Sequence, residues 1–293
     1  MKILAKYIKR NAKTKGEPKH MEGLEVDGYL AQDMSHWIDK HRTENAAWFS
    51  LAEEINQFAQ EQMLKLDIHN GNYQELLVAT AFLRALSMFQ GVILMSERGM
   101  IFEAGTLLRS QIEAMFVIGA AAKDRAFAHR YILSERAGKL RLMKNLLKSN
   151  GEVKEIVDTS ISWGEADGLR DSLKTDGISD IQIKDVAVAA DCSNWYTAVY
   201  TYLSQMVAHP TPLSLDNYLF ASDGEDMQEF LWGPDVFGIN CILSAAVESV
   251  IVALEGVSNV FEKSWSSALN SLHSRLAALS KPEGGFRLGY KTA

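Results

Sequence analysis

The sequence predicts an all-α protein that folds as one multi-helix bundle of about eight to ten helices. Apolar residues recur at helical spacing along most of the 293-residue chain, and strand-like alternation never persists over more than a few positions. The breaks between helical segments are short, which places consecutive helices side by side and antiparallel. No linker rich in proline, glycine or serine divides the middle of the chain, so residues 23–281 are predicted to form a single helical domain, with an N-terminal arm at 1–22 and a C-terminal tail at 282–293.

Strong helical patterns fill the first half of the chain. The earliest carries apolar side chains at helical spacing and ends at the turn-forming His-Asn-Gly-Asn sequence of residues 69–72. The next is rich in Leu, Ala and Met, and Arg84 is its only interior charge. The predicted helices of this half are, in order, residues 44–66, 73–97, 100–122 and 125–149.

The second half is predicted to be helical with one exception. Residues 152–174 are more polar and are expected to run over the surface, followed by a turn-rich link at 175–180. Residues 211–233 are the least helical part, and an extended piece or tight turn is predicted at 230–234. The remaining predicted helices are residues 183–190, 193–208, 236–254 and 263–279.

The net charge of −7 conceals a basic N-terminal arm. Residues 1–20 hold seven of the 30 Lys and Arg residues but only one of the 37 acidic residues, so the rest of the chain is strongly acidic. An acidic body excludes a broad surface that coats nucleic acid, because phosphate binding needs a concentrated positive field. The arm is interpreted as a mobile or self-docked tail, and the alternative is a contact with phosphates or anionic lipid.

Residues 236–254 are the most membrane-like segment, with Glu248 as the one formal charge. Polar residues such as Asn240 would be costly in lipid, and no Lys or Arg closely flanks the segment, so we predict no membrane span. The helix is instead expected to be a core element or a dimer interface. Two cysteines, Cys192 and Cys241, cannot make a disulfide scaffold, and no secretory signal pattern is present, so we predict a cytoplasmic protein.

The common catalytic and cofactor motifs are absent from the sequence. It contains no HExxH, GxGxxG, GxxxxGK[ST], GxSxG or CxxC motif. The Glu-x-x-His pattern that di-iron bundles need occurs only at residues 17–20, where a proline interrupts it. We therefore expect neither a metal nor a cofactor.

The clearest candidate for a functional site is the pair Arg109 and Glu113, which lie four residues apart and hence on one face of a predicted helix. The surrounding sequence is apolar. Burying both charges would be costly unless they pair, so the functional interpretation is that they line an internal cleft and serve a ligand. The alternative is a solvent-facing stripe or a structural ion pair.

A second cluster lies on the predicted helix at 193–208. Helical spacing places Tyr200 and Ser204 on one face and His209, at the end of the helix, on another. The negative end of the helix dipole favours the protonated form of His209, which suits a general acid–base group or an anion contact. The alternative is a helix-ending histidine before a proline, with the tyrosines half-buried in the core.

A third group opens the predicted helix at 125–149. Its members are basic or aromatic, and a positively charged solvent-exposed face is an alternative to a binding role. The residues of this group are Arg125, His129, Arg130 and Tyr131.

Two stretches carry a family resemblance. Residues 107–132, LLRSQIEAMFVIGAAAKDRAFAHRYI, and residues 196–219, YTAVYTYLSQMVAHPTPLSLDNYL, resemble the bacterial domain-of-unknown-function family 5677. The likeness covers roughly residues 75 to 255. It implies an all-helical fold and no established activity. It also implies that six residues belong together: Arg109, Glu113, Arg130, Tyr200, Ser204 and His209.

A looser likeness links the chain to the HEPN nucleases, helical-bundle proteins of toxin and phage-defence systems that cut RNA without metal. Their motif has four to six residues between Arg and His. Here the segment from Ser204 to His209 has the spacing but serine in place of arginine, and the segment from Arg125 to His129 is one residue too short. The fold would resemble the HEPN bundle at most in part.

Two functions remain open from the sequence. The favoured one is a non-catalytic binding or regulatory protein with a polar pocket around Arg109, Glu113 and His209. The alternative is a metal-independent, HEPN-like RNase or nucleotide-processing protein, with His209 as acid–base group, Arg109 or Arg130 stabilising phosphorane charge, and Tyr200 and Ser204 orienting the phosphate. A homodimer and an RNA or nucleotide ligand are the partners left open.

Overall fold

Helices make up almost all of the described chain. The computed structural model describes residues 22–32, 34–149, 161–221, 227–230, 233–234 and 238–280. Within these ranges the all-α bundle predicted from the sequence is confirmed, and the one departure is a short two-stranded ribbon. The basic residues of the predicted arm and the predicted C-terminal tail lie outside the described residues.

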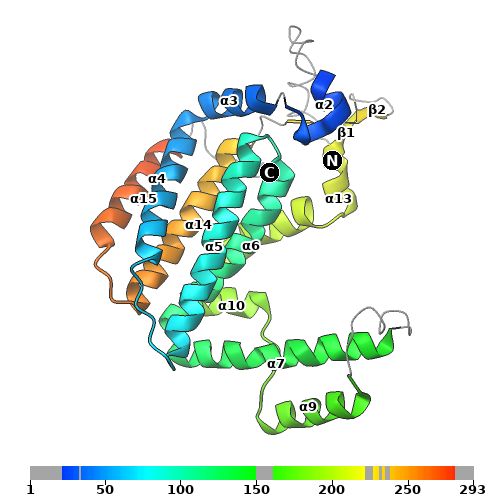
Figure 1. The fold of residues 1–293 in the computed structure, drawn as a ribbon, viewed down its shortest axis with the longest axis vertical. Coiled ribbons are helices and arrows are strands. Elements are labelled where there is room, and N and C mark those ends of the chain that lie inside the picture. Colours follow the sequence, from blue (N-terminus) through cyan, green and yellow to red (C-terminus); the bar gives the residue numbers. More distant parts are fainter. Residues whose placement is uncertain are drawn as a thin grey trace, which may run out of the picture.

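A central bundle carries the main hydrophobic core. Helix α14 lies against four neighbours, because apolar residues cover most of its circumference and most of them are buried (Figure 1). It is therefore a core element, one of the two roles expected for it. The helices of this bundle are α4 (Ala46–Met63), α5 (Tyr73–Glu97), α6 (Ile101–Lys123), α14 (Ile239–Val260) and α15 (Ser266–Leu279).

Helices α5 and α6 form the most extensive pair in the bundle. Their backbones approach closely at Gly91, where an added Cβ would lie 2.8 Å from Cδ1 of Leu107. A buried amide then ties α6 to α14: the Nε2 of Gln111 donates to the carbonyl oxygen of Ala246 at 2.8 Å and to the hydroxyl of Ser249 at 2.6 Å. These contacts fix the depth and register of α6, which carries the predicted Arg and Glu pair.

By length and composition, α5 and α14 could each cross a membrane. In the structure, half of the apolar window of α5 and 61% of that of α14 are buried inside the protein. One or two such helices are weak evidence for a span, because the core helices of a folded domain meet the same criteria.

Helix α7 (Arg125–Lys148) crosses the end of the bundle and continues beyond it, where α9 (Trp163–Thr175) packs along its far half (Figure 1). This pair has a small core of its own, formed by Met143, Leu147 and Ala166. A capping box at Ser162 begins α9.

The chain returns to α6 through α10 (Ile183–Ala189) and a helix over residues 193–208. This second helix is not α-helical throughout. It begins as α11 (Ser193–Trp195), winds as a π-helix over η3 (Tyr196–Tyr200), returns to α12 (Thr201–Leu203) and winds again as a π-helix over η4 (Ser204–Ala208). The sequence predicts an ordinary α-helix here. Over π-helical stretches as short as five residues, apolar spacing does not distinguish the i→i+5 hydrogen bonds of a π-helix from the i→i+4 bonds of an α-helix.

The opposite end of the bundle carries short elements, most of which the sequence analysis does not predict. Helices α2 and α3 are rich in polar residues, and α3 is placed by its contacts with α4 and α5. The strands are antiparallel and pair Leu219 with Phe230, where the sequence predicts an extended piece or turn at 230–234. The elements are α2 (Glu22–Asp27), η2 (Gly28–Leu30), α3 (Met34–Glu44), α13 (Pro212–Leu215), η5 (Asp216–Tyr218), β1 (Leu219–Ala221) and β2 (Met227–Phe230).

Candidate functional site

Arg109 on α6 meets the predicted tyrosine cluster on the helix at 193–208. Its Nε donates to the hydroxyl of Ser204 at 2.8 Å, and its Nη2 donates to the hydroxyl of Tyr200 at 2.6 Å. Tyr200 and Ser204 lie four residues apart and face α6 together, as helical spacing predicts. Residues separated by more than 90 positions are thus joined by direct side-chain hydrogen bonds.

Glu113 closes the network one turn further along α6. The hydroxyl of Tyr200 donates to its Oε1 at 2.8 Å, and the same oxygen lies 3.2 Å from Nη2 of Arg109. Tyr200 therefore accepts from the arginine and donates to the glutamate. We call Arg109, Glu113, Tyr200 and Ser204 the Arg109 cluster.

The Arg109 cluster is half open to solvent. Tyr200 and Ser204 are buried, whereas the side chains of Arg109 and Glu113 remain 22% and 31% exposed. In the described part of the chain, Nη1 of Arg109 and Oε2 of Glu113 make no hydrogen bond. A free donor and a free acceptor therefore remain on the exposed edge of an otherwise satisfied network.

Tyr200 is held as a neutral phenol. Burial raises its pKa to about 12, and the hydrogen bond to Glu113 and the charge of that carboxylate act in the same direction. Its ring lies against that of Tyr196, with centroids 5.2 Å apart, and the guanidinium of Arg109 lies 4.7 Å from the centroid of the Tyr200 ring. The phenol accordingly serves as a fixed hydrogen-bond relay at neutral pH.

The winding of the 193–208 helix and a glycine on α6 together place Tyr200 and Ser204. Tyr200 ends η3 and Ser204 begins η4, so both residues lie where the winding changes. An added Cβ on Gly105 would lie 2.8 Å from Cγ1 of Val207, which shows how closely η4 approaches α6. π-Helical turns are rare and are often found at functional sites.

Two of the six predicted residues do not join the cluster. His209 caps η4 in an extended conformation and is exposed, and its imidazole makes no hydrogen bond with the described residues. Arg130 is exposed on α7 and pairs with Asp124 at 3.0 Å. Neither Arg109 nor Arg130 contacts the His209 ring, so the geometry that the nuclease alternative needs is not present among the described residues.

Two further side chains lie near Glu113. The phenol of Tyr131 on α7 is half-buried, and its pKa is raised mainly by burial and also by the charge of Glu113, whereas Arg84 on α5 lowers it. Arg84 is level with this point because α5 and α6 run antiparallel and Gly91 faces Leu107. Its position as the only interior charge of an apolar helix is the signal in the sequence, but its place near Tyr131 cannot be inferred without the pairing of α5 with α6.

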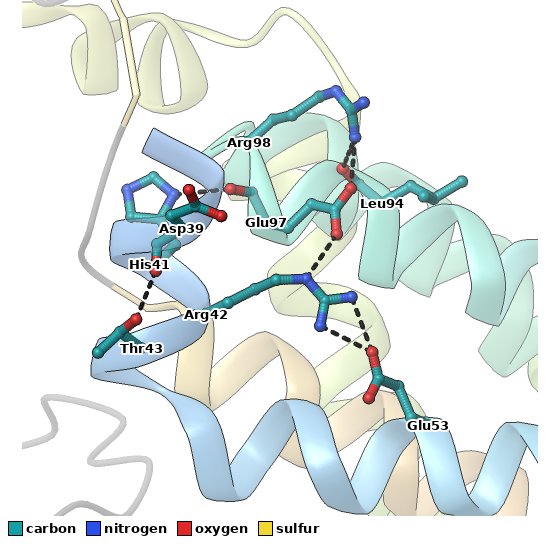
Figure 2. Close-up of polar contacts among 8 residues, drawn as sticks. All are labelled: Asp39, His41, Arg42, Thr43, Glu53, Leu94, Glu97 and Arg98. Carbon is teal, nitrogen blue, oxygen red and sulfur yellow. Dashed lines mark hydrogen bonds and ion pairs between the residues drawn. The ribbon is translucent and has the colours of Figure 1, made fainter. Parts of the chain in front are cut away.

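A second polar cluster, which the sequence analysis missed, joins α3, α4 and α5. The carboxylate of Glu97 is only 9% exposed and accepts from Nε of Arg42 at 3.1 Å and from Nη1 of Arg98 at 2.7 Å. Arg42 also binds Glu53 at 2.7 Å (Figure 2). We call Arg42, Glu53, Glu97 and Arg98 the Glu97 cluster. Its two positive and two negative charges cancel, and both oxygens of the buried Glu97 carboxylate are bonded, so we interpret it as a structural link between the three helices.

His41 anchors α3 beside this cluster. Its ring is fully buried, and Nδ1 donates to the backbone carbonyl of Glu97 at 2.9 Å (Figure 2). Burial lowers the pKa of His41, so the imidazole is neutral at physiological pH. This contact explains why a polar segment folds as a helix against the end of α5.

No metal centre is evident in the described ranges, where no three His, Cys, Asp or Glu side chains are grouped so that they could hold a metal ion. The two cysteines are both free thiols, Cys192 buried and Cys241 half-buried, and burial raises the pKa of each.

The fold and the Arg109 cluster define a helical-bundle protein with a partly open polar site between α6 and a π-wound helix. Comparison with protein families then identifies the chain: it belongs to the Family of unknown function (DUF5677), whose family model matches residues 75–226. The matched range spans all four residues of the Arg109 cluster, and the resemblance seen in the sequence is confirmed. No curated protein and no solved structure matches the chain.

Proposed function

We propose that this protein is a non-catalytic binding or regulatory protein and that the Arg109 cluster is its ligand site. The observation that carries the proposal is the half-open network of Arg109, Glu113, Tyr200 and Ser204. A purely structural ion pair would be expected to use its bonding capacity internally, as the buried carboxylate of Glu97 does when both of its oxygens accept from arginines. The Arg109 cluster instead leaves Nη1 of Arg109 and Oε2 of Glu113 on its exposed edge.

The charges of the site support binding over catalysis. Tyr200 keeps its proton at neutral pH, and the opposite charges of Arg109 and Glu113 neutralise each other. The exposed edge offers one donor and one acceptor side by side. This pattern complements an uncharged group that also carries both, such as an amide, better than it complements a phosphate.

One test separates a site from a structural pair by stability. Breaking a fully buried pair costs about 3–5 kcal/mol, whereas we expect Arg109→Ala and Glu113→Ala each to lower the unfolding free energy by less than about 2 kcal/mol, because both side chains are partly hydrated. The measurement is urea denaturation of each variant beside the wild type. Arg130→Ala is the matched control, since Arg130 is exposed and belongs to neither cluster. Losses of about 3 kcal/mol or more would make the pair structural and contradict the proposal.

A second test concerns catalysis. Purified protein incubated with RNA in EDTA should leave the RNA intact, and His209→Ala should behave as the wild type does. RNA cleavage by the wild type that His209→Ala abolishes would establish the nuclease alternative and overturn the non-catalytic proposal.

A further inference from the structure

A pocket of about 430 Å³ lies where α5 and α7 both begin, and it includes no residue of the Arg109 cluster. Its walls come from the turn before α5 and from the first turns of α5 and α7. The lining residues are Gly71, Tyr73, Gln74, Arg125, Ala126 and His129. None of them is acidic, although the chain as a whole carries a charge of −7. The pocket is therefore a locally basic site on an acidic protein.

Arg125 is the unpaired charge at this junction. Its neighbours are engaged: Lys123 pairs with Asp191, and Asp124 pairs with Arg130 at 3.0 Å. Arg125 is exposed and makes no ion pair or hydrogen bond with the described part of the chain. Its guanidinium is thus free to bind an anion from the pocket.

The acidic residues closest in sequence to the pocket, Asp124 and Glu75, form hydrogen bonds with other groups. Asp124 accepts from the backbone N–H of Ala126 at 2.8 Å as well as from Arg130. Glu75 accepts from the backbone N–H of His69 at 2.7 Å and lies 3.0 Å from that residue's Nδ1. Neither carboxylate lines the pocket, so neither neutralises Arg125 there.

Aromatic groups form the rest of the wall. His129 lies four residues after Arg125 and hence on the same face of α7, with its ring centroid 5.5 Å from that of Tyr73. Tyr73 is 51% exposed, so part of its side chain is accessible to a planar ligand. The Gln74 amide is held in the wall, because its Nε2 donates to the carbonyl of Ala121 at 2.7 Å.

We propose that this pocket binds a phosphomonoester attached to a planar base, with Arg125 and His129 on the phosphate and Tyr73 against the base. A guanidinium fork matches two phosphate oxygens, and an imidazole N–H can donate to a third. The volume falls in the range of small-molecule sites. The ligand chemistry is that of a nucleoside monophosphate, either free or as the 5′ end of an RNA strand.

Isothermal titration calorimetry tests the proposal with AMP, with inorganic phosphate and with a short oligoribonucleotide carrying or lacking a 5′-phosphate. We expect saturable AMP binding that is stronger than phosphate binding, and Arg125→Gln should weaken both by about tenfold or more. Tyr73→Ala should weaken AMP binding but not phosphate binding. Arg130→Gln, one turn away and already paired, is the matched control and should change the affinity by less than about twofold.

The oligonucleotide arms distinguish the two sources. If the 5′-phosphorylated strand binds more tightly than AMP and this binding depends on Arg125, the site recognises an RNA end. If the strand binds as tightly as AMP or less tightly, the site recognises a free nucleotide. Absence of saturable binding of AMP and of both strands at millimolar concentration, or wild-type affinity in Arg125→Gln, would overturn the proposal. Arg109→Ala should leave the AMP affinity unchanged, so failure here is separable from failure of the Arg109 cluster as a site.

Discussion

At the scale of single residues, Glu97 and Arg109 show two ways in which a charge is withdrawn from water. Glu97 is almost fully buried and has an arginine on each side, so every charge around it is compensated. Arg109 is compensated by Glu113 but keeps one free nitrogen at the surface. Both arrangements avoid an isolated buried charge, and only the second leaves bonding capacity for another molecule.

Glu97→Gln should be strongly destabilising, because two arginines would lose the carboxylate that neutralises them in a largely buried position. We expect a loss of about 2–4 kcal/mol in unfolding free energy. Glu53→Gln is the matched control: it touches the same Arg42 but is 53% exposed, so its loss should be below about 1 kcal/mol. Urea denaturation measures both, and equal losses would contradict the structural role assigned to Glu97.

Tyr200 predicts a dependence of stability on alkaline pH. Its pKa is about 12 in the folded protein against 10 ordinarily, so between these values the folded state keeps a proton that the unfolded state has lost. The contribution of Tyr200 to the unfolding free energy should therefore be fully present and independent of pH below about pH 10, and it should be lost between pH 10 and 12, by at most about 2.7 kcal/mol. Tyr200→Phe keeps the ring and removes this contribution.

The measurement is urea denaturation of wild type and Tyr200→Phe at several pH values from 8 to 12. Tyr131, Tyr202 and Tyr218 also have raised pKa values, and they contribute equally to both proteins. The difference between the two curves is therefore the informative quantity. A difference that stays constant across this range would show that the Tyr200 hydroxyl is not held in the network.

At the scale of elements, the sequence predicts the helices that an apolar pattern marks and misses the features that depend on contacts with neighbouring elements. The helix at residues 73–97 is predicted with its observed ends, because a strong apolar pattern is bounded by turn-forming residues. Helix α3 is missed because a buried histidine contact, not an apolar stripe, holds it in place. The π-windings of η3 and η4 leave no mark in residue spacing, and close packing on α6 accompanies them.

Gly105 tests the close approach of η4 to α6. Alanine there would place a Cβ 2.8 Å from Cγ1 of Val207, so despite its better helix propensity Gly105→Ala should cost about 1–3 kcal/mol. Adding Val207→Ala should recover part of that loss. Gly138→Ala on α7 is the control, since no heavy atom lies within 4 Å of the added Cβ, and it should stabilise by up to about 1 kcal/mol.

A double-mutant cycle of Gly105→Ala and Val207→Ala by urea denaturation gives the coupling directly. Additive losses would mean that the two residues do not press on each other and that η4 sits further from α6 than the structure has it.

At the scale of the whole molecule, the candidate site depends on which helices pair, and this is where reasoning from sequence ends. Arg109 and Glu113 could be placed on one face, and Tyr200 with Ser204 on another helix, from helical spacing alone. That these two faces meet, and that His209 and Arg130 stay outside, follows from the antiparallel contact of α6 with the 193–208 helix. Local spacing carries no information on such a contact between residues that lie 87 to 95 positions apart.

The two hydrophobic clusters predict that the molecule does not open all at once. The large cluster spans α4, α5, α6, α14 and α15, whereas Met143, Leu147 and Ala166 form a separate small one between α7 and α9. Because few apolar contacts hold α9, its amides should exchange with deuterium at least about tenfold faster than those of α14, through an opening that leaves the bundle folded.

Hydrogen–deuterium exchange followed by mass spectrometry measures the exchange rates of α9 and α14, and the Ala166→Asp variant tests whether α9 opens separately. A charge at this fully buried position should speed exchange in α9 and in the far half of α7 while leaving α14 unchanged. Exchange in α14 that rises in proportion would show instead that residues 23–281 unfold as the single unit predicted from the sequence.

The outcome also bears on function, because the first turns of α7 pack into the large cluster through Phe127 and Ala128. The pocket at Arg125 should therefore persist when α9 opens, and AMP binding to the Ala166→Asp variant should match that of the wild type.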